Sequence, residues 1–221
     1  GADAVNHRTS AYDIALMSRQ LLKYHPLIKN YTTIWMDTIR GGEFGLSNTN
    51  KLIRFYNGAT GLKTGYTASA GYCISATAER EGMELIAVVM KGETSDKRNT
   101  DAKALLNYGF SAYTLVSAAP EEPLPALPVT MGEAEQVGLT LPETGVTAVV
   151  EKAQASSREY RVDLPETLAA PIQQGQQVGT LTLCSGDTEV LTVPILAAES
   201  VPGRSWGRMF TDLLKQAVFL A

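Results

Sequence analysis

The 221-residue sequence contains only two cysteines, Cys73 and Cys184, about a hundred residues apart. Two isolated thiols cannot build a disulfide framework, and they do not form a zinc-ligand cluster. A chain of this length can bury a sizeable core without cross-links or a structural metal. We therefore expect both cysteines to be small buried hydrophobic side chains, and we predict no metal or other cofactor.

The sequence also lacks a basic tract, and its formal net charge is −4. This composition argues against nucleic acid as a partner. The charge is unevenly distributed: residues 1–115 carry 13 Lys and Arg against 10 Asp and Glu, whereas residues 116–221 carry 6 against 13. The change coincides with a proline-rich stretch. We therefore predict a first domain at 1–115, a linker at 116–128 and a second domain beyond it.

A clean transmembrane stretch is missing from the C-terminal end. Residues 205–221 place apolar side chains at helical spacing, but three charged residues interrupt them. This pattern predicts an amphipathic helix over 201–221 that lies in the membrane interface, with Trp206 at headgroup depth. The alternative is a helix docked on its own domain. The first six residues have neither the basic nor the apolar region of a signal peptide.

Between the linker and this helix, residues 129–200 have the pattern of β structure. Short apolar or alternating runs are separated by turns rich in Gly, Pro and Ser. The runs cover residues 147–152, 159–164, 177–184 and 189–197. Such spacing predicts a small all-β sandwich.

The first domain is predicted to mix helices and strands. Thr9 or Ser10 is expected to cap a helix that runs to about Tyr24. Thr94 or Ser95 is expected to cap a second helix, which runs from Thr94 to Tyr108 and ends at Gly109. Residues 31–56 are expected to be strand and loop with a turn at 41–42, and residues 71–78 and 83–90 form a hairpin.

A tripeptide before this hairpin, Lys63-Thr64-Gly65, combines three residue types with a common use. A Lys ammonium and a Thr hydroxyl can hold a substrate carboxylate or set the protonation of a neighbouring Ser. A Gly allows a ligand to lie against the strand backbone. This K-T-G triad is a motif of serine β-lactamases and penicillin-binding proteins.

The surrounding residues extend the pattern. The segments G-L-K-T-G-Y-T-x-x-A-G-Y-C, E-G-M-E-L-I-A-V-V-M and R-x-x-D-A-K-A-L-L-N-Y-G-F occur in this order. They resemble the serine D-alanyl-D-alanine carboxypeptidases, the low-molecular-mass penicillin-binding proteins, closely over residues 6–115 and loosely beyond. The resemblance implies an α+β fold: part of a β-lactamase/DD-peptidase-like antiparallel sheet with helices, then a β-rich domain and an amphipathic C-terminal helix.

Two motifs of that family are absent. No Ser in this sequence has a Lys three residues later or an Asn two residues later. In the family, the S-x-x-K and S-x-N motifs supply the nucleophile and its neighbours, N-terminal to the part that matches here. The chain therefore resembles the C-terminal portion of a carboxypeptidase whose nucleophile lies on another segment.

The resemblance assigns roles to the residues that are present. Lys63 would face the nucleophilic Ser, and Thr64 would bind the substrate carboxylate. The backbone N–H of Tyr66 would be one oxyanion-hole donor. The remaining substrate contacts would come from Gly65, Thr67 and Arg98. Without the resemblance, Arg98 would be assigned to a solvated helix face and the Tyr66 side chain to sheet packing.

The implied substrate is a peptidoglycan stem peptide ending in D-Ala-D-Ala, with β-lactams as inhibitors. The implied location is the bacterial cell envelope, outside the cytoplasmic membrane. A missing N-terminal half would leave apolar surface uncovered, which predicts a dimer or a companion fragment. One alternative is a non-catalytic envelope module that binds muropeptides or a partner. A β-lactamase is the other, and the linked β-domain argues against it.

Overall fold

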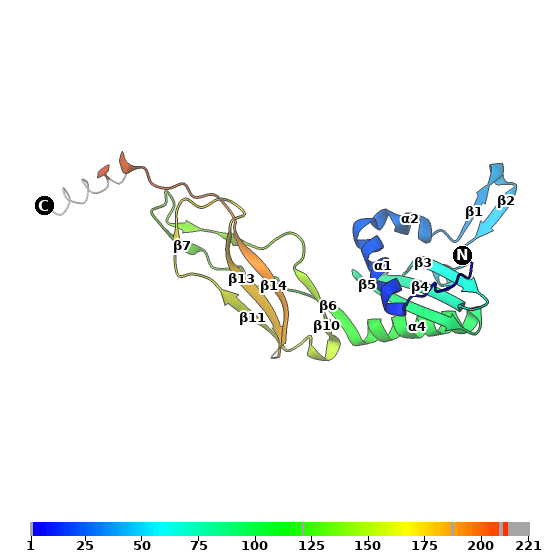
Figure 1. Ribbon diagram of the computed structural model, residues 1–221. Helices are drawn as coiled ribbons and strands as arrows, with labels where there is room; N and C mark the ends of the chain where they lie inside the picture. The colour runs from blue at the N-terminus through cyan, green and yellow to red at the C-terminus, as the bar shows by residue number, and fades with distance from the viewer. Residues whose placement is uncertain (1, 121, 187, 208–209, 212–221) are drawn as a thin grey trace. The chain divides into compact units, whose positions relative to one another are not determined.

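The computed structural model describes residues 2–120, 122–186, 188–207 and 210–211 (Figure 1). It divides into two compact units, Gly1–Thr114 and Leu115–Ala221, which are described separately below.

The first unit is built on a three-stranded antiparallel sheet and two long helices. The strand order is β3 (Ala59–Thr67), β4 (Gly71–Arg80) and β5 (Met83–Gly92), so among the described residues β3 forms one edge and β5 the other. Helices α1 (Ala11–Tyr24) and α4 (Ser95–Ala112) pack against this sheet. The hairpin formed by β4 and β5 agrees with the sequence prediction.

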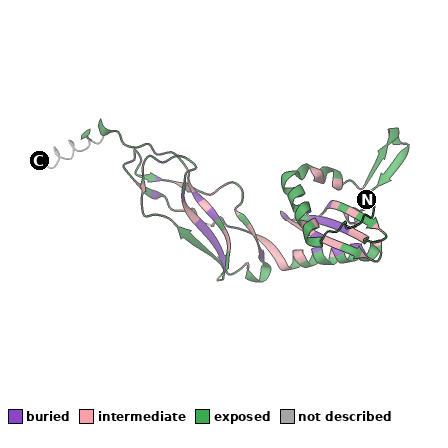
Figure 2. Ribbon diagram, viewed as in Figure 1, coloured by how far each residue is buried: buried purple, intermediate pink, exposed green. Residues whose placement is uncertain are grey.

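The two helices cover opposite faces of the sheet. Ser75 on β4 makes a hydrogen bond with Ser18 of α1. Ala78 is three residues further along β4, so its side chain points to the other face, and its cross-strand partner Leu85 lies against Gly109 of α4. The sheet is therefore an inner layer of this unit, and its buried residues follow the middle strand β4 (Figure 2).

Side-chain caps fix the starts of both helices, as predicted. The Ser10 hydroxyl accepts a hydrogen bond from the Asp13 N–H, and the Asp13 carboxylate accepts one from the Ser10 N–H, each at 3.1 Å. At α4, Thr94 accepts from the Lys97 N–H at 3.1 Å. The predicted end of the second helix at Gly109 is wrong, because the helix continues to Ala112. A Cβ on Gly109 would lie 2.5 Å from Leu85 Cδ1, so this glycine permits close packing instead of ending the helix.

Residues 31–56 contain the predicted turn together with helical pieces that the sequence analysis missed. Strands β1 (Met36–Ile39) and β2 (Phe44–Ser47) pair as a hairpin whose turn contains two glycines with positive φ, Gly41 and Gly42. A 3₁₀ turn at Arg40–Gly42 lies within the hairpin turn. Before the hairpin come a 3₁₀ turn at Pro26–Ile28 and α2 (Lys29–Thr32), and after it comes α3 (Leu52–Phe55).

Gly58 is a second position where the backbone requires glycine. Its φ is +82°, and an added Cβ would lie 2.5 Å from the Glu79 carbonyl oxygen. We expect Gly58→Ala to destabilise the first unit by about 1–3 kcal/mol, because the steric clash adds to the cost of a left-handed conformation. Urea denaturation measures the change. Gly45→Ala is the matched control, since no atom lies within 4 Å of a Cβ at that position, and equal effects of the two substitutions would contradict the prediction.

The second unit is all-β, as predicted. Its main sheet has four strands in the order β11 (Arg158–Asp163), β13 (Gln177–Ser185), β14 (Thr188–Ala197) and β9 (Leu139–Thr140). The other strands form two small sheets. One contains β12 (Leu168–Ala169), β7 (Leu127–Thr130) and β8 (Gln136–Val137), and the other contains β10 (Thr147–Glu151) and β6 (Tyr113–Ser117). A 3₁₀ turn covers Lys152–Gln154. One apolar core joins them, with Leu181, Leu183 and Ile195 fully buried.

The interpretation of residues 116–128 as a linker differs from the structure. Val116, Ala118 and Leu127 are buried in the core of the second unit, and the division between units falls after Thr114. Pro128 lies within β7, and the prolines of this stretch do not separate it from the core. The predicted end of the first domain at residue 115 lies one residue from this division, but the proline-rich composition did not reveal that apolar residues of 116–128 belong to the core of the second unit.

The predicted burial of the cysteines is correct for one of them. Cys184 is buried, whereas Cys73 is only half-buried and lines a cavity. Most of the predicted helix over 201–221 lies outside the described residues, so this prediction is untested. Among the residues that the structure describes, no helix is long and apolar enough to cross a membrane.

Candidate functional site

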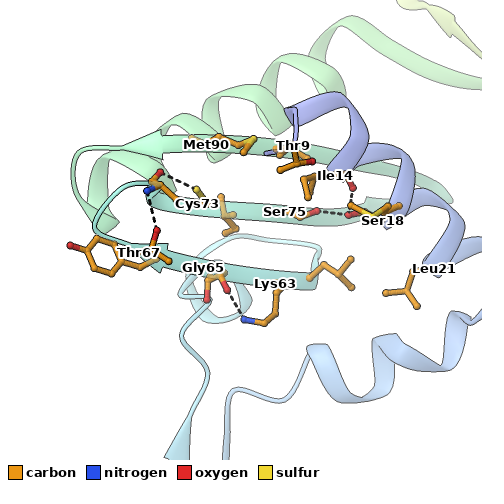
Figure 3. A pocket seen from close by; sticks show the side chains of 18 residues that line it. Thr9, Ile14, Ser18, Leu21, Lys63, Gly65, Thr67, Cys73, Ser75 and Met90 are labelled. Atoms are coloured by element: carbon orange, nitrogen blue, oxygen red, sulfur yellow. Dashed lines mark hydrogen bonds between the residues drawn. The ribbon is translucent and has the colours of Figure 1, made fainter. Parts of the chain in front are cut away.

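A cavity of about 460 Å³ lies between α1 and the sheet of the first unit (Figure 3). Its walls are mostly apolar, and six consecutive residues of the edge strand β3 line it, Leu62 to Thr67. The structure thus brings together all the predicted site residues except Arg98. The other lining residues come from α1, β4, β5 and the segment before α1, and include Ser18, Cys73 and Ser75.

Among the predicted site residues that line this wall, Lys63 is the one with a cationic side chain. Its side chain is exposed, and its ammonium donates to the backbone carbonyl of Thr64 at 2.5 Å. Cross-strand pairing places Lys63 opposite Ser75 and Gly65 opposite Cys73. A flexible ammonium at a sheet edge can be turned toward an incoming anion or hydroxyl at small cost.

The Thr64 hydroxyl is held by a residue that the sequence analysis did not single out. Its oxygen lies 2.6 Å from the Thr49 hydroxyl oxygen, and either can be the donor. Thr49 belongs to the polar bend Ser47-Asn48-Thr49-Asn50, which precedes α3. The polar composition of this bend was visible in the sequence, but no spacing rule connected it with the K-T-G triad.

The next three residues leave the edge of β3 open. No atom lies within 4 Å of a Cβ built on Gly65, so the space beside it is free for a ligand. The Tyr66 side chain is 59% exposed, and its ring packs on Tyr72 with centroids 4.4 Å apart. Thr67 shapes the turn after the strand, since its hydroxyl accepts from the Ala70 N–H at 3.0 Å.

Arg98 is buried, which differs from what its sequence context without the resemblance predicts. It is only 4% exposed, which excludes a solvated helix face. Its guanidinium donates to the Asn99 side-chain oxygen at 2.9 Å and to the Cys73 carbonyl at 3.3 Å. Burial lowers the pKa of this group, and the nearby Cys73, Tyr72 and Asp96 oppose that shift. The described geometry therefore has Arg98 joining α4 to β4, and its contact with a substrate carboxylate stays a prediction.

A carboxylate lies at the far end of the strand edge. The Ser69 hydroxyl donates a hydrogen bond to Asp3, and this bond, with one from Thr67, lowers the pKa of Asp3. Asp3 is exposed, so it adds a negative charge at the end of the strand edge opposite to Lys63.

The helix that forms the other wall is only partly covered. On α1 only Ser18 and Leu22 are buried, and five large apolar residues are exposed: Tyr12, Leu16, Met17, Leu21 and Tyr24. Met17 and Leu21 also line the cavity. So many exposed apolar side chains on one helix are typical of an element that packs against further protein.

Comparison with known proteins identifies two matching families. Residues 1–94 match the D-alanyl-D-alanine carboxypeptidase family, and residues 117–203 match the C-terminal domain of penicillin-binding protein 5. A Bacillus subtilis relative, the D-alanyl-D-alanine carboxypeptidase DacF, is 35% identical over 204 residues, which cover 90% of this chain and 52% of the relative. The D-alanyl-D-alanine carboxypeptidase DacC of Escherichia coli is 28% identical over 95% of this chain and 53% of its own length.

Solved structures show the same fold. Penicillin-binding protein 5 from Haemophilus influenzae superposes with a TM-score of 0.72 at 24% identity, covering 90% of this chain and 58% of that one. A peptidoglycan synthesis regulatory factor (PBP3) from Streptococcus pneumoniae gives a TM-score of 0.67 at 26% identity, over 87% of this chain and 57% of that one. The chain spans about half the length of the curated relatives it matches.

Proposed function

We propose that this chain, whose residues 1–94 belong to the D-alanyl-D-alanine carboxypeptidase family, is the C-terminal portion of a serine-type enzyme of that activity. The observation that carries the proposal is the placement of Lys63-Thr64-Gly65 on an edge strand along an open cavity. An extended peptide can lie beside such an edge and pair with its backbone. The substrate would be a peptidoglycan stem peptide ending in D-Ala-D-Ala.

The reaction would use a nucleophile from the N-terminal half of the full-length protein. A serine hydroxyl there would attack the carbonyl carbon of the penultimate D-Ala and form an ester. The C–N bond to the terminal D-Ala would break, and the departing amine would take up a proton. Water would then hydrolyse the ester and regenerate the serine.

Residues of this chain would bind the charged groups of that reaction. Lys63 would face the serine and stabilise its deprotonated form, and Thr64 would donate a hydrogen bond to the terminal carboxylate. The Tyr66 backbone N–H would be one donor to the oxyanion, and the backbone N–H of the nucleophilic serine would be the second. Gly65 and Thr67 would line the strand along which the peptide lies.

Arg98 would act on the same carboxylate through its positive charge. Direct contact would require its guanidinium to leave Asn99 and the Cys73 carbonyl. In the described arrangement the Arg98 guanidinium instead holds β4 beside Gly65, because it binds the carbonyl of Cys73, the cross-strand partner of that glycine.

The envelope location and the partners follow from this reaction. Peptidoglycan lies outside the cytoplasmic membrane, so the protein would work there, and β-lactams would acylate the same serine. The segment at 205–221 would attach it to the membrane surface. The exposed apolar side of α1 would be covered by the N-terminal half, or by a second copy when that half is absent.

Fluorescent penicillin tests the proposal by intact-mass spectrometry. We expect the full-length protein to gain one penicillin mass, on a peptide N-terminal to this chain, and residues 1–221 alone to gain none. An adduct within residues 1–221 would overturn the assignment of the nucleophile to another segment. No adduct on the full-length protein would contradict the enzymatic function and favour a non-catalytic binding module.

A further inference from the structure

The Thr49 hydroxyl, which has no role in the family motifs quoted above, lies 2.6 Å from the hydroxyl of Thr64. We propose that Thr49 is a positioning residue that aims the Thr64 hydroxyl proton at the substrate carboxylate. The proposal rests on the proposed function, in which Thr64 binds that carboxylate.

The direction of the hydrogen bonds follows from counting protons. Each threonine hydroxyl carries one proton, and an ionised carboxylate can only accept. When Thr64 gives its proton to the carboxylate, its oxygen can only accept from Thr49. The order is then fixed as Thr49 to Thr64 to carboxylate. Each donor in such a chain polarises the next, which strengthens the terminal bond to the anion.

Thr49 is held in place by the residue before it. The Asn48 side-chain amide donates to the backbone carbonyls of Thr32 at 3.2 Å and Ile34 at 3.0 Å. Its side-chain oxygen accepts from the Asn50 N–H at 2.9 Å. Asn48 therefore joins the bend to the preceding segment and also bonds to Asn50, the residue on the other side of Thr49.

The residue after it ties the bend to the strand that carries Thr64. Asn50 is only 2% exposed, and its amide donates to the Gly61 carbonyl at 2.7 Å. Its oxygen accepts from the Leu52 N–H at 3.1 Å. Because Gly61 and Thr64 belong to the same strand, the bend and β3 move together. The Thr49 hydroxyl is thus pre-organised relative to Thr64, although Thr49 itself is exposed.

The test compares Thr49→Val, which keeps the side-chain shape without the hydroxyl, with Thr49→Ser, which keeps the hydroxyl. In the full-length protein, we expect Thr49→Val to slow acylation by benzylpenicillin about fivefold to twentyfold, the effect of losing one hydrogen bond that supports a charged acceptor. Thr49→Ser should remain within about twofold of the wild type. Thr147→Val, on a strand of the second unit, is the control for a threonine that does not line the cavity.

A second ligand separates positioning from a structural effect. Benzylpenicillin methyl ester lacks the carboxylate, so it should acylate the protein more slowly than benzylpenicillin does. Its acylation rate should be the same for the wild type and for Thr49→Val. Equal loss with both ligands, or a lowered melting temperature of Thr49→Val, would mean that Thr49 only supports the fold. Acylation of Thr49→Val at the wild-type rate would overturn the inference and leave the proposed function intact. Failure of the wild type to react would instead count against the proposed function.

Discussion

Replacing Lys63 by methionine in the full-length protein is expected to lower the rate of acylation by benzylpenicillin about 10²–10³-fold. Methionine retains the length and apolar character of the side chain but removes its charge. A cation that stabilises developing negative charge in a site shielded from water typically contributes an effect of this size. Stopped-flow or quenched acylation with mass detection measures the rate.

The matched control for this change is Lys97→Met. Lys97 is an exposed lysine of α4 that pairs with Glu93, which lies just before the helix. Such surface pairs contribute little, so its acylation rate should stay within twofold of the wild type. If Lys63→Met also reacted at the wild-type rate, Lys63 would have no part in acylation, and the K-T-G strand would only shape the cavity.

The largest loss of stability in the second unit is expected from Leu181→Ala on β13. Leu181 is 0% exposed in the core that joins the strands of this unit. Truncating a fully buried leucine removes its apolar contacts and leaves a cavity, which together cost about 2–5 kcal/mol. Hydrogen exchange of the β13 and β14 amides measures the loss where it occurs, as a lower free energy of opening.

Val162→Ala provides the control within the same sheet. Val162 is the cross-strand partner of Leu181, but it lies on the edge strand β11 and is 43% exposed. Its truncation should cost well under 1 kcal/mol, because little area is removed from the interior. A comparable loss in both variants would mean that β11 is covered by further protein in solution.

Local signals predicted the regular elements of the chain well. The caps at Ser10 and Thr94 depend on residues within one helical turn, and both are present as predicted. Gly109 shows the limit of this reasoning. A glycine after an apolar stripe is a common helix end, but here α4 continues to Ala112 and Gly109 lies close against Leu85 of β5.

The site residues also divide into those placed by local sequence and those placed by contacts with distant parts of the chain. The motif placed Lys63 to Thr67 on one cavity wall, since consecutive residues of one strand stay together in any fold that keeps the strand. The location of Arg98 depends on how α4 lies on the sheet, and the sequence contains no information on the depth of its guanidinium. Thr49 was missed because its contact with Thr64 spans fifteen residues and a bend.

The hydrogen bond between Ser18 and Ser75 links the evolution of two distant positions. Ser18 donates to the Ile14 carbonyl at 2.8 Å, so the bond of 2.7 Å to Ser75 uses the Ser75 proton. Both side chains are buried where α1 meets β4. Changing one serine alone to an apolar residue leaves the other with an incomplete set of bonds, whereas changing both together can be nearly neutral. Divergence at this contact is therefore epistatic: whichever serine mutates first decides which replacements its partner can later accept.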